Sequence, residues 1–198
     1  MASWILRTFR TREPEHMLQL YKSYVRPLLE YCSPLWDPNL IGEIERVEAV
    51  QRSFTTAIKG CENLDYWARL KALGLWSLQR RRERFKILTM WKIWKGLLPN
   101  HGDISFRMSL RRGPTAERPL GKARLKGVNT LIFNGFTSSS LALFNAVPGN
   151  IKDRETVAGV KSALDAYLAG FPDSPPVRGY SCPNKNSILS WLSAGLPL

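Results

Sequence analysis

The stretch of sequence that decides the fold is Leu20-Tyr21-Lys22-Ser23-Tyr24-Val25-Arg26-Pro27-Leu28-Leu29-Glu30-Tyr31-Cys32-Ser33-Pro34-Leu35-Trp36. Its apolar side chains recur every three or four residues, which is the spacing of one helix face. That face would consist of Met17, Tyr21, Tyr24, Leu28, Tyr31 and Leu35. Pro27 interrupts the pattern, because proline lacks an amide donor and crowds the preceding turn, at a cost of roughly 3 kcal/mol. We therefore expect an amphipathic helix that is kinked or broken near Pro27 and held in shape by tertiary packing.

The composition is that of a folded, strongly basic protein. The chain has 198 residues, of which 44% are hydrophobic and seven are Trp, so it can form one ordinary core or two small ones. The net charge of +13 favours an anionic partner, most often a nucleic acid, although a solvated basic surface has the same composition. Between Trp76 and Lys126 lie 14 Lys or Arg residues and three acids, so about a quarter of the chain carries most of the charge.

The residue pattern argues against several kinds of site. The three cysteines have no paired spacing, which is typical of free thiols in a reducing compartment, and we expect Cys32 to be buried on the packing face of its helix. Neither His16 nor His101 lies near a cysteine at a spacing that would bind zinc. No apolar run approaches the ~20 residues of a membrane span, and the apolar run 4–6 is too short for a signal peptide. We expect an intracellular protein without metal or cofactor, in the nucleus or in a cytoplasmic ribonucleoprotein.

Helix signals dominate the first half of the chain. We expect helices at 3–12, from Pro14 onward, from Asp37-Pro38 to about Ile58, at 65–73, and from a Ser77 cap to about Leu98. Beyond Pro99 the pattern weakens, and we expect a loop at 105–124, a short strand or hairpin at 126–136, and helices at 138–146, 154–169 and 187–193. The predicted fold is mainly α: a helical block at 1–99, a basic loop segment at 100–136, and a looser α-rich extension at 137–198.

Several motifs in order along nearly the whole chain resemble one protein family. The stronger ones are Val25-Arg26-Pro27-x-Leu29-Glu30-Tyr31, Glu48-x-x-Gln51-Arg52-x-Phe54-Thr55, Tyr66-x-x-Arg69-Leu70, Leu73-x-Leu75-x-Ser77-Leu78, Arg80-Arg81-Arg82-Glu83-Arg84 and Trp91-Lys92-Ile93. Weaker ones are Leu143-Phe144-Asn145-x-Val147-Pro148, Lys161-x-x-Leu164-Asp165-x-Tyr167-Leu168, Pro172-Asp173-x-Pro175-x-x-x-Gly179-Tyr180 and Asn186-Ser187-Ile188-Leu189-x-Trp191. This order resembles the thumb and post-thumb region of non-LTR (LINE-like, Jockey-like) retrotransposon reverse transcriptases. Ala142 and Val160 depart from the family pattern, where an arginine and a phenylalanine are usual.

The resemblance implies a non-catalytic part of an RNA-directed DNA polymerase. Reverse transcriptases need paired aspartates to hold two metal ions, and no Asp-Asp pair occurs in this sequence. The palm that binds Mg²⁺ would lie upstream of Met1, so we do not expect this chain to polymerise. Its partners would be RNA, DNA or an RNA–DNA hybrid, together with the upstream palm of the parent enzyme.

The predicted helix 77–98 carries the candidate nucleic-acid site. Its apolar stripe Ile87, Trp91, Trp94 and Leu98 is flanked by a basic ridge of Arg81, Arg84, Lys92 and Lys95, and cations spaced in this way can neutralise successive phosphates. Lesser candidates are Arg80, Arg82 and Lys86 on the same helix, and Arg111, Arg112, Arg118, Lys122, Arg124 and Lys126 in the segment beyond it. We expect the tryptophans to be core residues rather than platforms for base stacking.

Several alternatives stay open. The ridge arginines could instead pair with Glu43, Glu45 or Glu48 of the neighbouring helix. The basic segment could be an ordered loop or an arm that orders on binding. The chain could be a structural or protein-interaction module, domesticated or degenerate, that binds no nucleic acid. It could also fail to fold alone, since the apolar face at 4–6 has no upstream partner in this sequence.

Overall fold

The computed structural model describes residues 1–38, 40–100, 104–109, 113–117, 136–173 and 187–193. Over these residues the chain is mainly α-helical with one two-stranded antiparallel sheet, which confirms the predicted fold class. The chain divides into two compact units: unit 1 comprises Met1–Arg82 with Asp173–Asn186, and unit 2 comprises Glu83–Pro172 with Ser187–Leu198.

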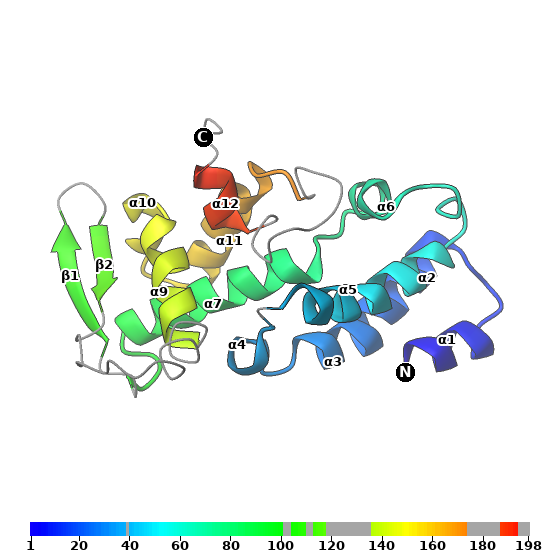
Figure 1. Ribbon diagram of the computed structural model, residues 1–198, viewed down its shortest axis with the longest axis horizontal. Helices are drawn as coiled ribbons and strands as arrows, with labels where there is room; N and C mark the ends of the chain where they lie inside the picture. The colour runs from blue at the N-terminus through cyan, green and yellow to red at the C-terminus, as the bar shows by residue number, and fades with distance from the viewer. Residues whose placement is uncertain (39, 101–103, 110–112, 118–135, 174–186, 194–198) are drawn as a thin grey trace. The chain divides into compact units, whose positions relative to one another are not determined.

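Unit 1 is built from helices that follow one another along the chain (Figure 1). They are α1 (Ala2–Thr8), α2 (Pro14–Leu20), the π-helix η1 (Tyr21–Val25), α3 (Arg26–Glu30), α4 (Ser33–Trp36), α5 (Ile41–Thr56), α6 (Tyr66–Ala72) and the start of α7 (Leu78–Trp94). Their buried side chains form one core of Ile5, Met17, Tyr21, Val25, Phe54, Ile58, Cys61, Tyr66, Leu70 and Leu75. Of the N-terminal apolar face at 4–6, Ile5 is 1% exposed and packs into this core and Leu6 packs partly against it, whereas Trp4 is 59% exposed.

The helix around Pro27 is interrupted by a wider turn. In η1 the chain is π-helical, and the Arg26 N–H reaches back five residues to the Tyr21 carbonyl. This turn lies directly before Pro27, where a regular α-helix would need the missing amide donor and would crowd the proline ring. A π-turn inserts one residue, so it rotates the following side chains by about 100° relative to a continuous α-helix.

This rotation changes which side chains face the core. Val25 follows Tyr21 into the core and is 3% exposed, whereas Tyr24 is 55% exposed and Leu28 is 62% exposed. The predicted face is therefore wrong beyond Tyr21, because its spacing assumed an uninterrupted α-helix. Two apolar stripes run along this segment, and only one of them is buried.

A second interruption of the helix, at Cys32, explains why the predicted face also fails at Tyr31 and Leu35. Cys32 adopts a left-handed φ of +50° between α3 and α4, so Tyr31 and Leu35 do not continue one helical face and are 77% and 80% exposed. The thiol of Cys32 is exposed, and the expectation that it is buried was wrong.

Elsewhere most helix boundaries lie at the capping and helix-breaking residues that the sequence indicated. Pro14 is the first residue of α2, and Asp65 caps α6 by accepting a hydrogen bond from the Ala68 N–H at 2.9 Å. The prediction was wrong at Asp37-Pro38, because α5 begins only at Ile41. Helix α7 ends at Trp94 rather than near Leu98, and Gly96 follows it with a left-handed φ of +72°.

Unit 2 contains the rest of α7, the sheet and the C-terminal helices. The elements are β1 (Ser105–Ser109), β2 (Gly113–Glu117), α9 (Phe136–Ala146), α10 (Gly149–Lys152), α11 (Val157–Ala169) and α12 (Ile188–Ser193). Strand β2 packs against α9 and α10 (Figure 1). On α11 the side chains of Val160, Leu164 and Leu168 are buried, as the predicted helix required.

The β1–β2 hairpin corrects the prediction of a loop at 105–124. Ser105 pairs with Glu117 and Ser109 pairs with Gly113, in antiparallel register. Gly113 has a φ of +65°, and a Cβ there would lie 3.0 Å from the Cα of Gly149. The glycine that indicated a break is thus needed to begin the strand against α10. The hairpin predicted at 126–136 falls almost entirely outside the described residues.

Candidate nucleic-acid interface on the long helix

The N-terminus of α7 is occupied by side chains of the protein itself. The Ser77 hydroxyl accepts a hydrogen bond from the Arg80 N–H at 3.1 Å, which confirms the predicted cap. Glu48 of α5 accepts another from the Gln79 N–H at 2.7 Å. Asp173 accepts from both the N–H and the hydroxyl of Ser77, at 2.6 and 2.7 Å. Carboxylates therefore hold the position where a helix N-terminus could otherwise bind a phosphate.

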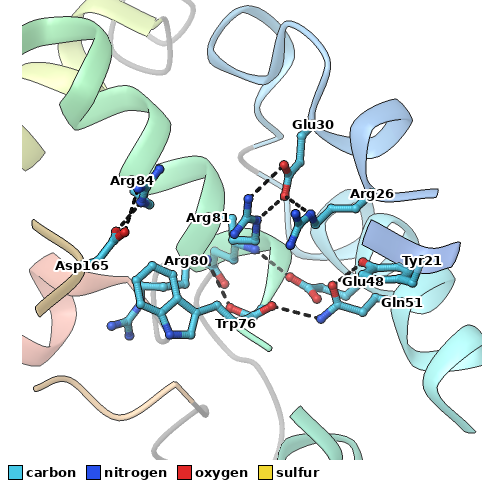
Figure 2. Close-up of polar contacts among 12 residues, drawn as sticks. Tyr21, Arg26, Glu30, Glu48, Gln51, Trp76, Arg80, Arg81, Arg84 and Asp165 are labelled. Atoms are coloured by element: carbon cyan, nitrogen blue, oxygen red, sulfur yellow. Dashed lines mark hydrogen bonds and ion pairs between the residues drawn. The ribbon is translucent and has the colours of Figure 1, made fainter. Parts of the chain in front are cut away.

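A buried polar network connects this end of α7 to the core of unit 1 (Figure 2). The hydroxyl of Tyr21 donates to Gln51 Oε1 at 2.5 Å, and Gln51 Nε2 donates to the Trp76 carbonyl and to the Tyr66 hydroxyl, both at 3.1 Å. Tyr66 in turn donates to Glu48 Oε2 at 2.5 Å. Each member is fixed by the next, as a satisfied interior network requires.

Burial sets the acid–base behaviour of this network. Desolvation raises the pKa of Glu48 above its ordinary value, and the hydrogen bond from Tyr66 and the charge of Arg82 act in the opposite direction. Desolvation and the Glu48 carboxylate both raise the pKa of Tyr66, so its phenol stays protonated and remains a donor. The network is therefore structural, since neither group is placed to exchange protons with a ligand.

The arginines at the start of α7 pair with carboxylates of unit 1. Arg81 forms an ion pair with Glu30 of α3, in which Arg81 Nη2 lies 3.1 Å from Glu30 Oε2 (Figure 2). Arg82 is 2% exposed, and its Nε lies 2.5 Å from Asp37 Oδ1. This second pair explains why Asp37 does not cap α5, because its carboxylate is committed to α7.

Unit 2 binds the next basic residues of α7 in the same way. Arg84 forms an ion pair with Asp165 of α11, with Arg84 Nη2 2.8 Å from Asp165 Oδ2. Lys86 is 4% exposed, and its ammonium group donates to the Ser139 hydroxyl at 3.0 Å. Arg80, at 1% exposed, is also enclosed.

These contacts correct the expectation of a solvent-exposed ridge. Arg81 and Arg84 are paired with carboxylates, and Arg80, Arg82 and Lys86 are buried, so five of the predicted contact residues serve the interior of the protein. The ion pairs of Arg81, Arg82 and Arg84 are with Glu30, Asp37 and Asp165. Of the partners considered from the sequence, Glu48 interacts with the charge of Arg82. Helical spacing placed the cations correctly on α7 but could not show which distant carboxylates fold against them.

The C-terminal end of α7 keeps two accessible cations. Lys92 and Lys95 are half-buried, and no ion pair to either of them is present in the part of the chain that the structure describes. The Lys95 ammonium lies 4.2 Å from the ring centre of Trp94 and 5.9 Å from that of Trp91. Trp91 is 1% exposed and its indole N–H donates to the Lys152 carbonyl, so it is a core residue as predicted.

The remaining predicted contacts lie outside the described residues. They are Arg111, Arg112, Arg118, Lys122, Arg124 and Lys126. In the described part of the chain no group of three or more His, Cys, Asp or Glu side chains is arranged to hold a metal ion. No helix among the described residues combines the length and apolarity of a membrane span.

Sequence reasoning missed an exposed aromatic surface near the N-terminus. Phe9, Tyr24 and Tyr31 are 37%, 55% and 77% exposed, in a segment that also carries exposed Arg10 and Lys22. The apolar periodicity placed Tyr24 and Tyr31 on the buried helix face, and only the conflict between that periodicity and Pro27 could have indicated otherwise. Comparisons with protein-family models, curated proteins and solved structures find no match to this chain.

Proposed function

We propose that this chain is the thumb and post-thumb part of a non-LTR retrotransposon reverse transcriptase, and that it holds nucleic acid by its phosphate backbone without a catalytic step of its own. The observation that carries the binding proposal is the pair Lys92 and Lys95 at the end of α7, which no described carboxylate neutralises. Lys95 directly follows the last residue of α7, and its N–H still donates to the Trp91 carbonyl at 2.9 Å. The helical backbone thus extends to Lys95, so the two cations, three residues apart, lie on the same side and can contact neighbouring phosphates.

The packing of the motif residues supports the family assignment. Glu48, Gln51 and Tyr66 are motif residues and form the buried network. Asn145, from a weaker motif, accepts from the Ala116 N–H at 2.8 Å and donates to the Ala116 carbonyl at 3.0 Å, which secures strand β2. A resemblance concentrated in residues with such packing roles is what a shared fold would produce. A frame encoding a paired-aspartate palm directly upstream of Met1 in the genome is expected, and a genomic sequence without one contradicts the assignment.

Contacts to phosphates would position a nucleic acid without reading its sequence. Lysine is a point charge on a flexible chain, so it suits backbone contacts better than recognition of base edges. Six further cations lie in the segment 111–126, directly after β1 and around β2 in the sequence. They would add to the same electrostatic attraction.

Salt dependence tests this proposal. We expect the logarithm of the duplex binding constant to fall with the logarithm of salt concentration, with a slope of about −0.9 for each phosphate contact. The double variant Lys92→Gln/Lys95→Gln should make that slope less negative by about 2 in total. Fluorescence anisotropy with duplexes of unrelated sequence measures both effects.

A matched control separates local contact from net charge. Arg46→Gln/Lys71→Gln removes the same two charges from exposed positions on α5 and α6 of unit 1, and should leave the slope nearly unchanged. Equal effects of the two double variants would show that only overall charge matters. A flat salt response of the unmodified protein would remove the nucleic-acid proposal altogether.

One observation favours a second candidate, a structural or protein-interaction module that binds no nucleic acid. Three arginines of α7 are committed to Glu30, Asp37 and Asp165, so much of the charge that suggested binding serves to hold helices together. A flat salt response would support this alternative.

A further inference from the structure

A pocket at the N-terminal side of unit 1 has no role in the contacts described above. It has a volume of about 280 Å³ and is lined by residues that follow α1, by α2 and by η1. Its apolar lining comes from Phe9, Leu20 and Tyr24, and its polar lining includes His16, Gln19 and Ser23. Pockets that bind whole drug-sized ligands run from about 300 Å³ upward, so this one suits a single ring system.

The π-turn is what brings Tyr24 to this pocket. In an uninterrupted α-helix Tyr24 would join Tyr21 on the buried stripe, but the residue inserted by η1 turns it outward, and it is 55% exposed. π-turns occur frequently at functional sites, because they tolerate a less favourable helix geometry in order to place a side chain. Single exposed aromatics are common on proteins, whereas here two of them line one pocket with hydrogen-bonding groups.

The opposite wall of the pocket is held in place. The Arg12 guanidinium donates to the Phe9 carbonyl and, at 2.5 Å, to the Leu6 carbonyl, so it fixes the backbone that carries the Phe9 ring. The Arg12 carbonyl accepts from the Lys59 N–H at 2.9 Å, which ties this connection to the segment after α5. A wall ordered before binding lowers the entropy cost of capturing a ligand.

The surroundings of the pocket are positively charged. Residues 1–26 contain five basic side chains and two acids. Of these, Glu13 is paired with Lys59 at 2.8 Å, and Arg26 is paired with Glu30 at 4.0 Å. Arg10 and Lys22 are exposed, and each lies next in sequence to a pocket residue, Phe9 or Ser23. The charge therefore complements an anion attached to whatever ring the pocket accepts.

We infer that this pocket binds an unpaired base of single-stranded RNA or DNA, with Phe9 and Tyr24 contacting the ring and Arg10 and Lys22 the adjoining phosphates. An unpaired base offers the flat ring, the polar edge and the flanking phosphate that these groups match. In a duplex the ring faces are covered by stacking, so the pocket selects single strands. The inference extends the proposed nucleic-acid binding to a second site and a defined strand type.

The test uses the full chain and labelled oligonucleotides of one length. Oligouridine RNA and oligothymidine DNA should bind, and an abasic strand with the same number of phosphates should bind at least about fivefold more weakly, because base–aromatic stacking contributes about 1 kcal/mol or more per base. Tyr24→Leu should weaken binding of the base-containing strands by a similar factor, and Tyr24→Phe should restore it. The ratio of RNA to DNA affinity tells which strand is preferred.

Tyr31→Leu is the matched control, since Tyr31 is exposed on the same segment but does not line the pocket. It should leave single-strand binding unchanged, and circular dichroism should show that all variants are folded. Equal binding of abasic and base-containing strands would overturn the inference, as would equal effects of Tyr24→Leu and Tyr31→Leu.

The two binding proposals fail in different ways. If Tyr24→Leu has no effect while Lys92→Gln/Lys95→Gln reduces the salt slope on duplex, the pocket inference is wrong and the α7 proposal stands. If Tyr24→Leu weakens only single-strand binding and the lysine variants leave the slope unchanged, the pocket inference stands and the α7 assignment is wrong.

Discussion

Glu48 shows how one residue can hold several elements together. It is 4% exposed, it accepts hydrogen bonds from the Tyr66 hydroxyl and the Gln79 N–H, and it lies close enough to Arg82 for their charges to interact. The carboxylate thus joins α5, α6 and the start of α7. A buried charge without such partners would be strongly destabilising, so removing any one partner should be costly.

The raised pKa of Glu48 predicts a pH dependence of stability. Because burial puts its folded-state pKa above the unfolded value of 4.5, the folded protein binds more protons than the unfolded chain just above pH 4.5. The contribution of Glu48 to the free energy of unfolding is therefore fully present below pH 4.5, and it is lost as the pH rises through the folded-state pKa. Glu48→Gln should remove this dependence of the unfolding free energy on pH, as measured by urea unfolding at several pH values. Glu45→Gln should leave the dependence intact, because Glu45 is exposed on the same helix. Identical slopes for wild type and Glu48→Gln would contradict the assignment.

The ridge residues show what could and could not be predicted at this scale. Helical spacing correctly placed Arg81 and Arg84 on α7, because a period of 3.6 residues is a local property. Their partners Glu30 and Asp165 lie 51 and 81 residues away in the sequence, so only the tertiary fold could reveal them. Charge reversal of either arginine would test packing rather than binding, which is why the lysines are the better probes.

At the scale of elements, local rules placed most helix starts correctly, but not the start of α5 or the end of α7. The starts of α2, α6 and α7 at Pro14, after Asp65 and after Ser77 follow from capping chemistry alone. The failures came where one residue changed the period. Pro27 indicated that the helix had to be kinked or broken. In the structure a π-turn with one inserted residue precedes Pro27 instead, and this turn shifts the buried face of the helix. The hairpin was missed because Gly113 and Pro114 signal a turn, whereas here they form a strand beside α10.

A coupling experiment tests the link between Pro27 and the π-turn. Deleting Lys22 removes the inserted residue and should return the segment to α-helical geometry, which then conflicts with Pro27 at a cost of roughly 3 kcal/mol. Adding Pro27→Ala to the deletion should recover most of that loss, because alanine restores the amide donor and removes the ring. Denaturant unfolding of the two single variants and the combined variant measures the interaction energy. If the deletion is equally destabilising with proline or alanine at position 27, the π-turn does not depend on Pro27.

At the scale of the whole molecule, the chain leaves unit 1 at Arg82 and returns to it at Asp173. The return is secured by the two hydrogen bonds from Ser77 to Asp173, across a separation of 96 residues. Unit 2 has its own long-range contacts, among them Arg84 with Asp165 and the bonds between Asn145 and Ala116. Composition could predict that one core or two would form, but the discontinuous path depends on these specific pairings.

The Ser77–Asp173 contact lies within unit 1 and the Arg84–Asp165 contact lies within unit 2, so removing either contact should destabilise only its own unit. Asp173→Ala leaves the N–H and hydroxyl of Ser77 without this acceptor, and unit 1 should lose about 1–3 kcal/mol of stability. Native-state hydrogen exchange should then show faster exchange in α5 and α6, with α11 little changed. Asp165→Ala should show the reverse pattern with a smaller effect, because the side chain of Asp165 is 42% exposed and its ion pair is partly screened. If either variant accelerates exchange equally in both sets of helices, the two units unfold as one and their stabilities are not separable.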